Sequence, residues 1–201
     1  MRMHAARCTA VLVFAVCGYS QNPFIPTPQA PLSIQDKWKI HARRTTSPTG
    51  FLRSAVTAGW DQWQNDPMEW GQGMAGYSRR FGHKVSYRAV KNGLGLSLDV
   101  TLRQDPRYFR SEEQGFWKRT PHALTYVIVT RTDSGGRTFS TWRVGSAYGA
   151  AFITNSWRPD RVGGTADALQ RGTVTLGLDA VSNVLKEFWP DIKRKFRRGG
   201  N

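Results

Sequence analysis

The sequence predicts a mainly α-helical protein, built as a compact bundle of about four to six helices rich in glycine and alanine. One observation is an amphipathic helical face near the carboxyl end, formed by Val174, Leu178, Val181, Leu185 and Phe188. A second is the recurrence of small residues at every fourth position, which would let two helix backbones approach closely. Two such series are Ser78, Gly82 and Ser86, and Ala89, Gly93 and Ser97.

The first 20 residues have the pattern of a Sec-type signal peptide. A basic start is followed by the apolar run Cys8–Cys17 and then by the small residues Gly18 and Ser20, at −3 and −1 of the expected cut. The apolar run is too short to span a membrane. Lipidation of Cys17 is an alternative, but Val16 stands where a lipidation signal has a small residue. Cleavage before Gln21 removes both cysteines, so we expect a mature chain without disulfides or thiolate sites, in the periplasm or at the outer membrane.

Residues 21–32 contain four prolines and are expected to form an extended linker before a single helical domain at 33–192. The first helix begins after Ser33, whose side chain can cap it, with Asp36 at the third helical position. Ser47-Pro48 marks a second helix start, and that helix is expected to run to about Asn65. The pair Asp66-Pro67 ends it, because a residue before proline avoids helical geometry.

A long helix is expected from about Met74 to Arg103. The stretch 116–157 has two readings, of which helix–loop–helix is favoured. The alternative is an α+β fold with one β-hairpin around 124–144, turning at the sequence DSGG. Pro190 is expected to end or kink the last helix. The basic segment 193–201 is expected to be a tail without fixed structure.

The net positive charge of the chain indicates which classes of molecule it is expected to bind. The chain has 29 Lys and Arg against 14 Asp and Glu, a net charge of +15, which falls to +13 without Arg2 and Arg7 of the signal peptide. In a cytosolic protein this charge would indicate nucleic acid. For an exported protein we expect no nucleic acid but an anionic lipid, lipopolysaccharide or a cell-wall polymer.

Motifs for catalysis or for cofactors are scarce. His41, His83 and His122 are far apart and lack metal-ligand spacing, so neither a metal nor a cofactor is expected. Whether the chain is an enzyme stays open, with a non-catalytic role favoured. The enzymatic alternative is a cell-wall glycan hydrolase that uses Glu69 with Asp99 or Glu112, since glycan cleavage needs two nearby carboxyl groups.

Two groups of polar residues draw attention. Asp99 and Asp179 interrupt apolar helical stretches, and a buried pairing of such an aspartate with an arginine would fix helix register. In RQDPRYFR, Asp105 and Pro106 suit a corner where Asp105 caps the next segment, and Tyr108 and Phe109 are apolar anchors. The three arginines of this segment and two from the stretch 129–140 form the predicted anion- or partner-binding set: Arg103, Arg107, Arg110, Arg131 and Arg137.

Four blocks together resemble an uncharacterised family of exported bacterial envelope proteins. They are EWGQGMAGYSRRFG (69–82), LRQDPRYFR (102–110), VTRTDSGGRTFS (129–140) and NVLKEFWPDI (183–192). The resemblance implies a mainly helical envelope protein and brings no activity, cofactor or assigned site. The favoured function is therefore non-catalytic binding to an anionic envelope surface. Besides the hydrolase, a membrane-embedded helical homo-oligomer is a further alternative, suggested by the small-residue series.

Overall fold

The computed structural model of the protein describes residues 31–113 and 115–198. The predicted signal peptide with Cys8 and Cys17, most of the predicted linker, and residues 199–201 lie outside the described residues.

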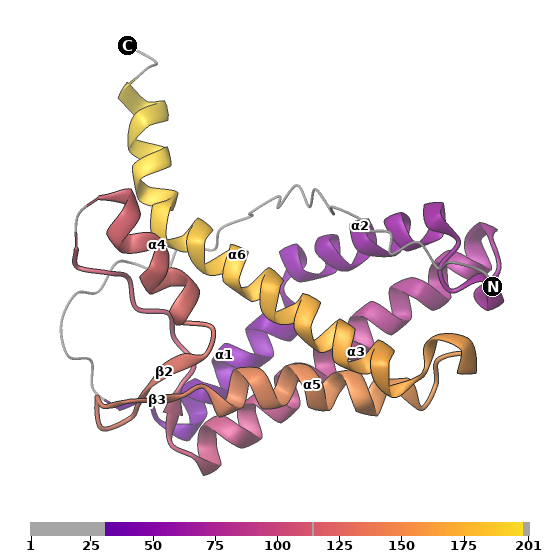
Figure 1. Cartoon of the computed structure of the whole chain (residues 1–201), viewed down its shortest axis with the longest axis horizontal. Helices are drawn as coiled ribbons and strands as arrows, with labels where there is room; N and C mark the ends of the chain where they lie inside the picture. Colours follow the sequence, from indigo (N-terminus) through magenta and orange to yellow (C-terminus); the bar gives the residue numbers. More distant parts are fainter. Residues whose placement is uncertain (1–30, 114, 199–201) are drawn as a thin grey trace, which may run out of the picture.

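The described residues form six α-helices, two short 3-10 helices and a small sheet (Figure 1). The predicted mainly helical fold is confirmed. In chain order the elements are α1 (Ile34–Thr46), α2 (Pro48–Gln64), η1 (Met68–Trp70), α3 (Gly73–Thr101), β1 (Gln104–Asp105), α4 (Phe116–Thr125), β2 (Val129–Thr132), β3 (Arg137–Phe139), α5 (Thr141–Asn155), η2 (Asp160–Val162) and α6 (Thr165–Arg198).

Capping side chains and prolines set the first helix ends as predicted. The Ser33 hydroxyl accepts a hydrogen bond from the Asp36 N–H at the start of α1, and Ser47 does the same for Gly50 at the start of α2. Asn65, in left-handed geometry with φ 54°, ends α2. These contacts satisfy N–H and C=O groups that a helix end leaves without partners.

Helix α3 is the central element of the bundle. It packs against α5, α2 and α1, while α6 crosses α5 and carries α4 near its carboxyl end (Figure 1). Helix α6 continues through Pro190 to Arg198, and its last turns project from the bundle. The expectation that 193–198 lacks fixed structure is therefore wrong. Proline removes one backbone hydrogen bond, and here the helix continues beyond that loss.

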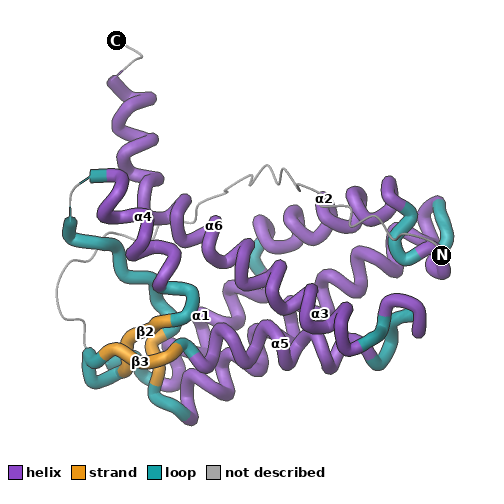
Figure 2. The backbone as a smooth tube through the Cα atoms, viewed as in Figure 1, coloured by secondary structure: helices purple, strands orange, loops and turns teal. Residues whose placement is uncertain are grey.

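The sheet is a three-stranded antiparallel unit at one end of the bundle (Figure 2). Its order is β1-β2-β3, and the β2–β3 hairpin pairs Val129 with Phe139 and Arg131 with Arg137. The favoured helix–loop–helix reading of 116–157 is thus incorrect for 129–139, where the alternative hairpin forms. Helices α4 and α5 precede and follow the hairpin in the chain. The β-branched residues lie in the hairpin strands, and Ser140 begins the next helix.

Small residues make the central helices fit together, but those of the two series predicted on α3 are not among them. A Cβ atom added at Gly149 would meet Leu94 at 2.9 Å, and one at Gly172 would meet Tyr148 at 2.3 Å. These positions join α5 to α3 and α6. In contrast, all six members of the two predicted series on α3 are exposed, and both of their glycines face open space. Periodicity identifies a face of a helix but not which neighbour it meets.

The interior holds many charged groups, while large apolar side chains lie outside. The buried apolar core consists mostly of alanines on α5 and neighbouring helices, whereas Arg80, Asp99 and Glu187 have no exposed surface. Trp117, Met74 and Phe196 are each at least 80% exposed. Among the described residues we find no helix that combines the length and the apolar character needed to cross a membrane.

The glycines of GQGMAG (71–76) have a structural explanation. Gly71 and Gly73 adopt φ values of 72° and 73°, which favour glycine, as the chain enters α3. A Cβ atom at Gly76 would lie 2.2 Å from the carbonyl oxygen of Gly71. The same carbonyl accepts a 2.7 Å hydrogen bond from buried Arg80, which also binds the carbonyl oxygens of Asp66 and Pro67.

We predict that Gly76→Ala destabilises the protein by about 1–3 kcal/mol, because the added methyl group overlaps a fixed backbone carbonyl. The matched control is Gly82→Ala in the same helix, where open space surrounds the position. That change should stabilise by about 0.5–1 kcal/mol through helix propensity. Urea unfolding of both variants measures the difference, and equal effects would contradict the close approach at Gly76.

Candidate anion-binding site

The RQDPRYFR segment forms a corner, as predicted, but Asp105 does not cap a helix there. Its carboxylate accepts hydrogen bonds from the Arg107 backbone N–H at 2.9 Å and from the Arg107 Nε at 3.0 Å. Asp105 also lies in strand β1 opposite Arg131. After buried Pro106, residues 107–113 have no regular structure, so Asp105 closes a turn and holds Arg107.

The carboxylate of Glu187 joins this segment to α4 and α6. It has no exposed surface and accepts hydrogen bonds from the Tyr108 hydroxyl at 2.8 Å, the Ser111 N–H at 3.2 Å and the Arg119 Nε at 2.9 Å. Arg119 reaches a second carboxylate, Asp191, at 2.6 Å. A buried charge is stable only when such partners surround it. Glu187 therefore fixes the position of α4 relative to the corner.

Lys37 holds the hairpin turn on the other side. Its buried ammonium group donates to the Asp133 carboxylate at 2.7 Å and to the Asp99 carbonyl oxygen at 3.0 Å. Asp133 belongs to the turn between β2 and β3, and its N–H also binds the Arg103 carbonyl oxygen at 2.8 Å. The hairpin is thus attached to both α1 and the end of α3.

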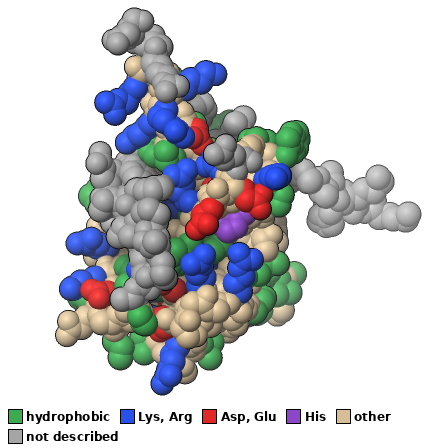
Figure 3. All heavy atoms as spheres, turned by 90° about the vertical axis from the view of Figure 1, so that its left-hand side faces the viewer, with side chains coloured by type: hydrophobic (Ala, Val, Ile, Leu, Met, Phe, Trp, Pro, Cys, Tyr) green, Lys and Arg blue, Asp and Glu red, His purple; other side chains and the backbone are tan. Residues whose placement is uncertain are grey.

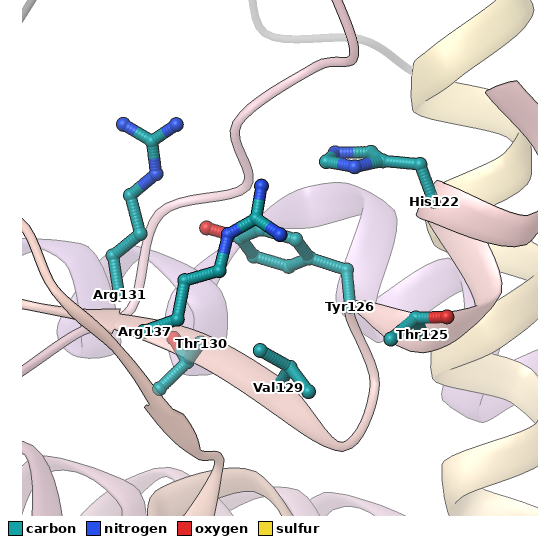
Figure 4. A pocket seen from close by; sticks show the side chains of 7 residues that line it. All are labelled: His122, Thr125, Tyr126, Val129, Thr130, Arg131 and Arg137. Atoms are coloured by element: carbon teal, nitrogen blue, oxygen red, sulfur yellow. The ribbon is translucent and has the colours of Figure 1, made fainter.

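A small cavity of about 40 Å³ opens between α4 and the hairpin. This volume is far below the several hundred Å³ of a site that encloses a whole small molecule. It suits a single small polar group at the surface instead. Figure 4 shows the residues that line it: His122, Thr125, Tyr126, Val129, Thr130, Arg131 and Arg137.

Arg131 and Arg137 dominate this cavity. They lie directly opposite each other in the antiparallel ladder, and both side chains rise from the same side of the hairpin (Figure 4). None of the ion pairs among the described residues involves either arginine. The Arg131 guanidinium lies 4.6 Å from the centre of the Phe109 ring and packs against it in a cation–π contact.

The wall of the cavity comes from α4. The His122 Nε2 donates to the Phe109 carbonyl oxygen at 3.0 Å, which leaves Nδ1 as the acceptor nitrogen of the ring. Tyr126 is buried beneath the arginines, and desolvation raises its pKa to about 12, so it stays a neutral phenol. The residues that line the cavity therefore offer positive charge and hydrogen-bond donors, while the nearby carboxylate of Asp105, opposite Arg131 in the ladder, is held by Arg107.

The structure does not bring all five predicted arginines together. Arg107 is held by Asp105 at the edge of the site, over the Phe109 ring at 5.3 Å. Arg110 donates to the Glu187 carbonyl oxygen at 2.9 Å. Arg103 has a left-handed backbone with φ 51° and lines a separate open hollow with Asp133 and Ser134. Of the set, only Arg131 and Arg137 line the cavity.

Asp99 and Asp179 both form pairs, although their partners are not the arginines that we expected. The Asp99 carboxyl lies 2.6 Å from the His41 Nε2, and Asp179 accepts from the Lys91 Nζ at 2.7 Å. Burial raises the pKa of Asp99 to about 8 and lowers the pKa of His41 to about 3, although Arg44 and Lys37 oppose the first shift. The Asp99–His41 pair is thus a neutral acid beside a neutral imidazole, sharing one proton.

The carboxylates of the hydrolase alternative lie far apart. Glu69 precedes α3 and binds Arg161 at 2.7 Å, whereas Asp99 lies near the other end of this 29-residue helix. Pro67 and Trp70, on either side of Glu69, contact Arg80 and His83, which lie 19 and 16 residues before Asp99 on α3. At 1.5 Å per residue, this places Glu69 about 25 Å from Asp99 along the helix, well beyond the span of a glycan-cleaving pair. Glu112 lies in the exposed loop after Ser111, at the Asp99 end of the molecule. The described residues contain no cluster of ligands suited to a metal ion.

Sequence reasoning missed several residues that build this site, namely Lys37, Arg119, His122, Tyr126 and Glu187. Glu187 and His122 are separated along the chain from the residues that they contact, so no local spacing indicates them. The block NVLKEFWPDI, which contains Glu187, was the one available signal. Comparison of the chain with protein-family profiles, with curated proteins and with solved structures found no match.

We predict that Arg119→Met destabilises the protein by about 3–5 kcal/mol, because it leaves the buried Glu187 carboxylate without its cation. The double variant Arg119→Met with Glu187→Met should be less destabilised than the single variant, since both charges are then absent. Guanidinium unfolding checks this order. A double variant that simply adds two losses would contradict the role of Glu187.

The Asp99–His41 pair predicts a specific dependence of stability on pH. Between about pH 4 and 6.5 the pair holds one proton in both the folded and unfolded states, so its contribution is flat. Between pH 6.5 and 8 the folded state alone keeps that proton on Asp99, and the free energy of unfolding should fall by about 2 kcal/mol as pH rises.

Asp99→Asn should remove this fall, because an amide has no proton to retain. Urea unfolding of both proteins at pH 5.5, 6.5 and 8 measures the two slopes. Parallel curves for the wild type and the variant would show that Asp99 is not protonated in the folded state.

Proposed function

We propose that this protein is an exported, non-catalytic binding protein that attaches to phosphate groups of the bacterial envelope surface. The attachment face is formed by α4 and the β2–β3 hairpin. The single observation that carries the proposal is the Arg131–Arg137 pair, two directly opposed arginines that form no ion pair among the described residues, since Asp105, opposite Arg131 on the other side, binds Arg107.

Like charges directly opposite each other destabilise a β-ladder. An oxyanion between Arg131 and Arg137 would convert that repulsion into two charge-assisted interactions. The planar guanidinium group matches phosphate oxygens in a two-pronged geometry, which favours phosphate over a diffuse negative surface. Phe109 restrains Arg131 before binding, so less side-chain freedom is lost when the anion arrives.

Apolar side chains next to the arginines favour a lipid-bearing surface. Residues two apart on a strand share a face, so Val129 and Phe139 lie on the same side of the hairpin as the arginine pair. Phe139 is 55% exposed, and Ile128 beside the end of β3 is 50% exposed. Trp117, in the first turn of α4, is 84% exposed. Figure 3 shows basic and apolar side chains on this face, together with acidic side chains beside the histidine.

This combination is typical of proteins that lie on a membrane surface, with cations at the phosphate level and aromatic residues slightly deeper. The overall positive charge adds long-range attraction, which weakens as salt increases. Anionic phospholipid and lipopolysaccharide both offer phosphate next to acyl chains, whereas a cell-wall polymer offers only the anion. The signal-peptide pattern supplies the route to this location.

We predict that Arg131→Gln with Arg137→Gln weakens binding of the mature chain to anionic phospholipid vesicles at least 10-fold. The matched control is Arg43→Gln with Arg79→Gln, which removes the same charge from exposed positions on α1 and α3. The control should weaken binding no more than about threefold, through net charge alone. Cosedimentation at low and high salt measures both.

Two further arms separate the possible sources of the phosphate. Lipopolysaccharide and purified cell wall replace the vesicles, and Phe139→Ser tests the apolar side chains next to the arginines. For a lipid surface, Phe139→Ser lowers binding to vesicles and lipopolysaccharide but not to cell wall. Equal losses in the site variant and the charge-matched control would reduce the interaction to net charge, and no binding by the wild type in any arm would end the proposal.

A further inference from the structure

Arg88 occupies an unusual position between α3 and the first turn of α2. Its guanidinium lies against the backbone of Gly50, so closely that a Cβ atom there would be 2.2 Å from Nη1. The Phe51 ring covers the same group, with its centre 4.6 Å from the guanidinium carbon. Arg88 therefore points into the amino-terminal end of the 17-residue helix α2.

Arg88 has neither a hydrogen-bond acceptor nor a carboxylate partner among the described residues. All three of its guanidinium nitrogens are buried and without an acceptor. Arginine does not lose its proton under ordinary conditions, so it cannot escape this cost by becoming neutral. An uncompensated buried cation is strongly destabilising, and proteins normally pair such groups.

The groups around Arg88 are also positively charged, which increases the electrostatic cost of leaving Arg88 without an anion. The amino-terminal end of a helix carries partial positive charge. Burial lowers the pKa of Arg88, and repulsion from Arg53, one turn further along α2, lowers it again. Lys186, on α6, is partly exposed. Desolvation and, to a smaller extent, repulsion from Arg44, Arg143 and Arg53 lower its pKa to about 8.

These cations belong to one positively charged region that joins five helices. No ion pair among the described residues includes any of Arg44, Arg53, Arg88, Arg143 and Lys186. The neighbouring acid Asp179 is already held by Lys91 at 2.7 Å. Arg143 and Arg44 are partly satisfied by carbonyl oxygens and by the Trp142 ring. Arg88 is the member of this set whose three guanidinium nitrogens are all buried without a hydrogen-bond acceptor among the described residues.

We propose that the start of α2 is a second anion-binding site, where Arg88 and Arg53 bind the oxygens of a phosphate or carboxylate group. Pro48 has no N–H, and the N–H groups of Gly50 and Phe51 bond to Ser47, so Thr49 supplies the remaining N–H of this turn. Phe51 is 40% exposed and is the side chain that an entering anion displaces.

This second site does not depend on the hairpin face. Its residues come from α2 and α3, whereas the hairpin site is built from α4, β2 and β3. It differs also in its ligand geometry, because the guanidinium is already buried and a bound oxyanion would be largely enclosed. We therefore expect it to bind a small oxyanion, or the anionic group of a larger molecule, more specifically than a surface charge does.

The test measures thermal unfolding of the mature chain with inorganic phosphate, acetate or chloride at constant ionic strength. For the wild type we expect a saturable rise in Tm with phosphate or acetate, but not with chloride. Arg88→Met should abolish this rise. In chloride alone Arg88→Met should unfold at the same temperature as the wild type or higher, because it removes an unpaired buried charge.

Two more variants keep the test decisive. Arg53→Gln changes an exposed side chain, so it should fold and bind phosphate about 3- to 10-fold more weakly by calorimetry. Arg131→Gln with Arg137→Gln should keep the anion-dependent rise in Tm, which separates this site from the hairpin. Anionic phospholipid vesicles in a parallel arm show whether a lipid phosphate competes with free phosphate. A wild type without an anion-dependent shift, or a shift retained in Arg88→Met, would overturn the proposal.

Discussion

The buried carboxylate of Glu187 is the constraint on which the binding face depends. A charge without exposed surface must be surrounded by donors, and these come from three separate places: the Tyr108 hydroxyl, the Ser111 N–H and the Arg119 guanidinium. Satisfying one carboxylate therefore fixes the corner segment, α4 and α6 relative to one another. The wall of the cavity follows from this, since His122 lies one turn along α4 from Arg119 and binds the same corner.

The interior of the bundle explains why large apolar side chains lie on its surface. Close approach of α3, α5 and α6 leaves room mainly for alanine and glycine, so large apolar side chains cannot be accommodated there. Charged groups fill much of the remaining interior and specify partners more strictly than apolar contacts do. The large apolar residues lie on the outside, where they are available for contact with a lipid surface or another molecule.

The arginines divide by the partner that each one has. Arg80 and Arg119 bind carbonyl or carboxylate oxygens within the fold and hold loops and helices in place. Arg131, Arg137 and Arg88 form no ion pair within the described part of the chain. Like charges that face each other and buried cations without a partner lower folding stability. Such a loss is usually retained where binding of a ligand recovers the lost stability.

The starts of α1 and α2, the end of α2, the corner at Asp105-Pro106 and the positive charge could be read from the sequence alone, because caps, prolines and composition act locally. The sequence also offered the hairpin as an alternative through DSGG. Tertiary structure decided the rest. The small residues of α3 face outward because packing, not spacing, selects the buried face. Arg131 meets Arg137 through strand register, and Glu187 meets Tyr108 across 79 positions of the chain. Contacts between distant residues depend on how whole elements pack, which no local pattern encodes.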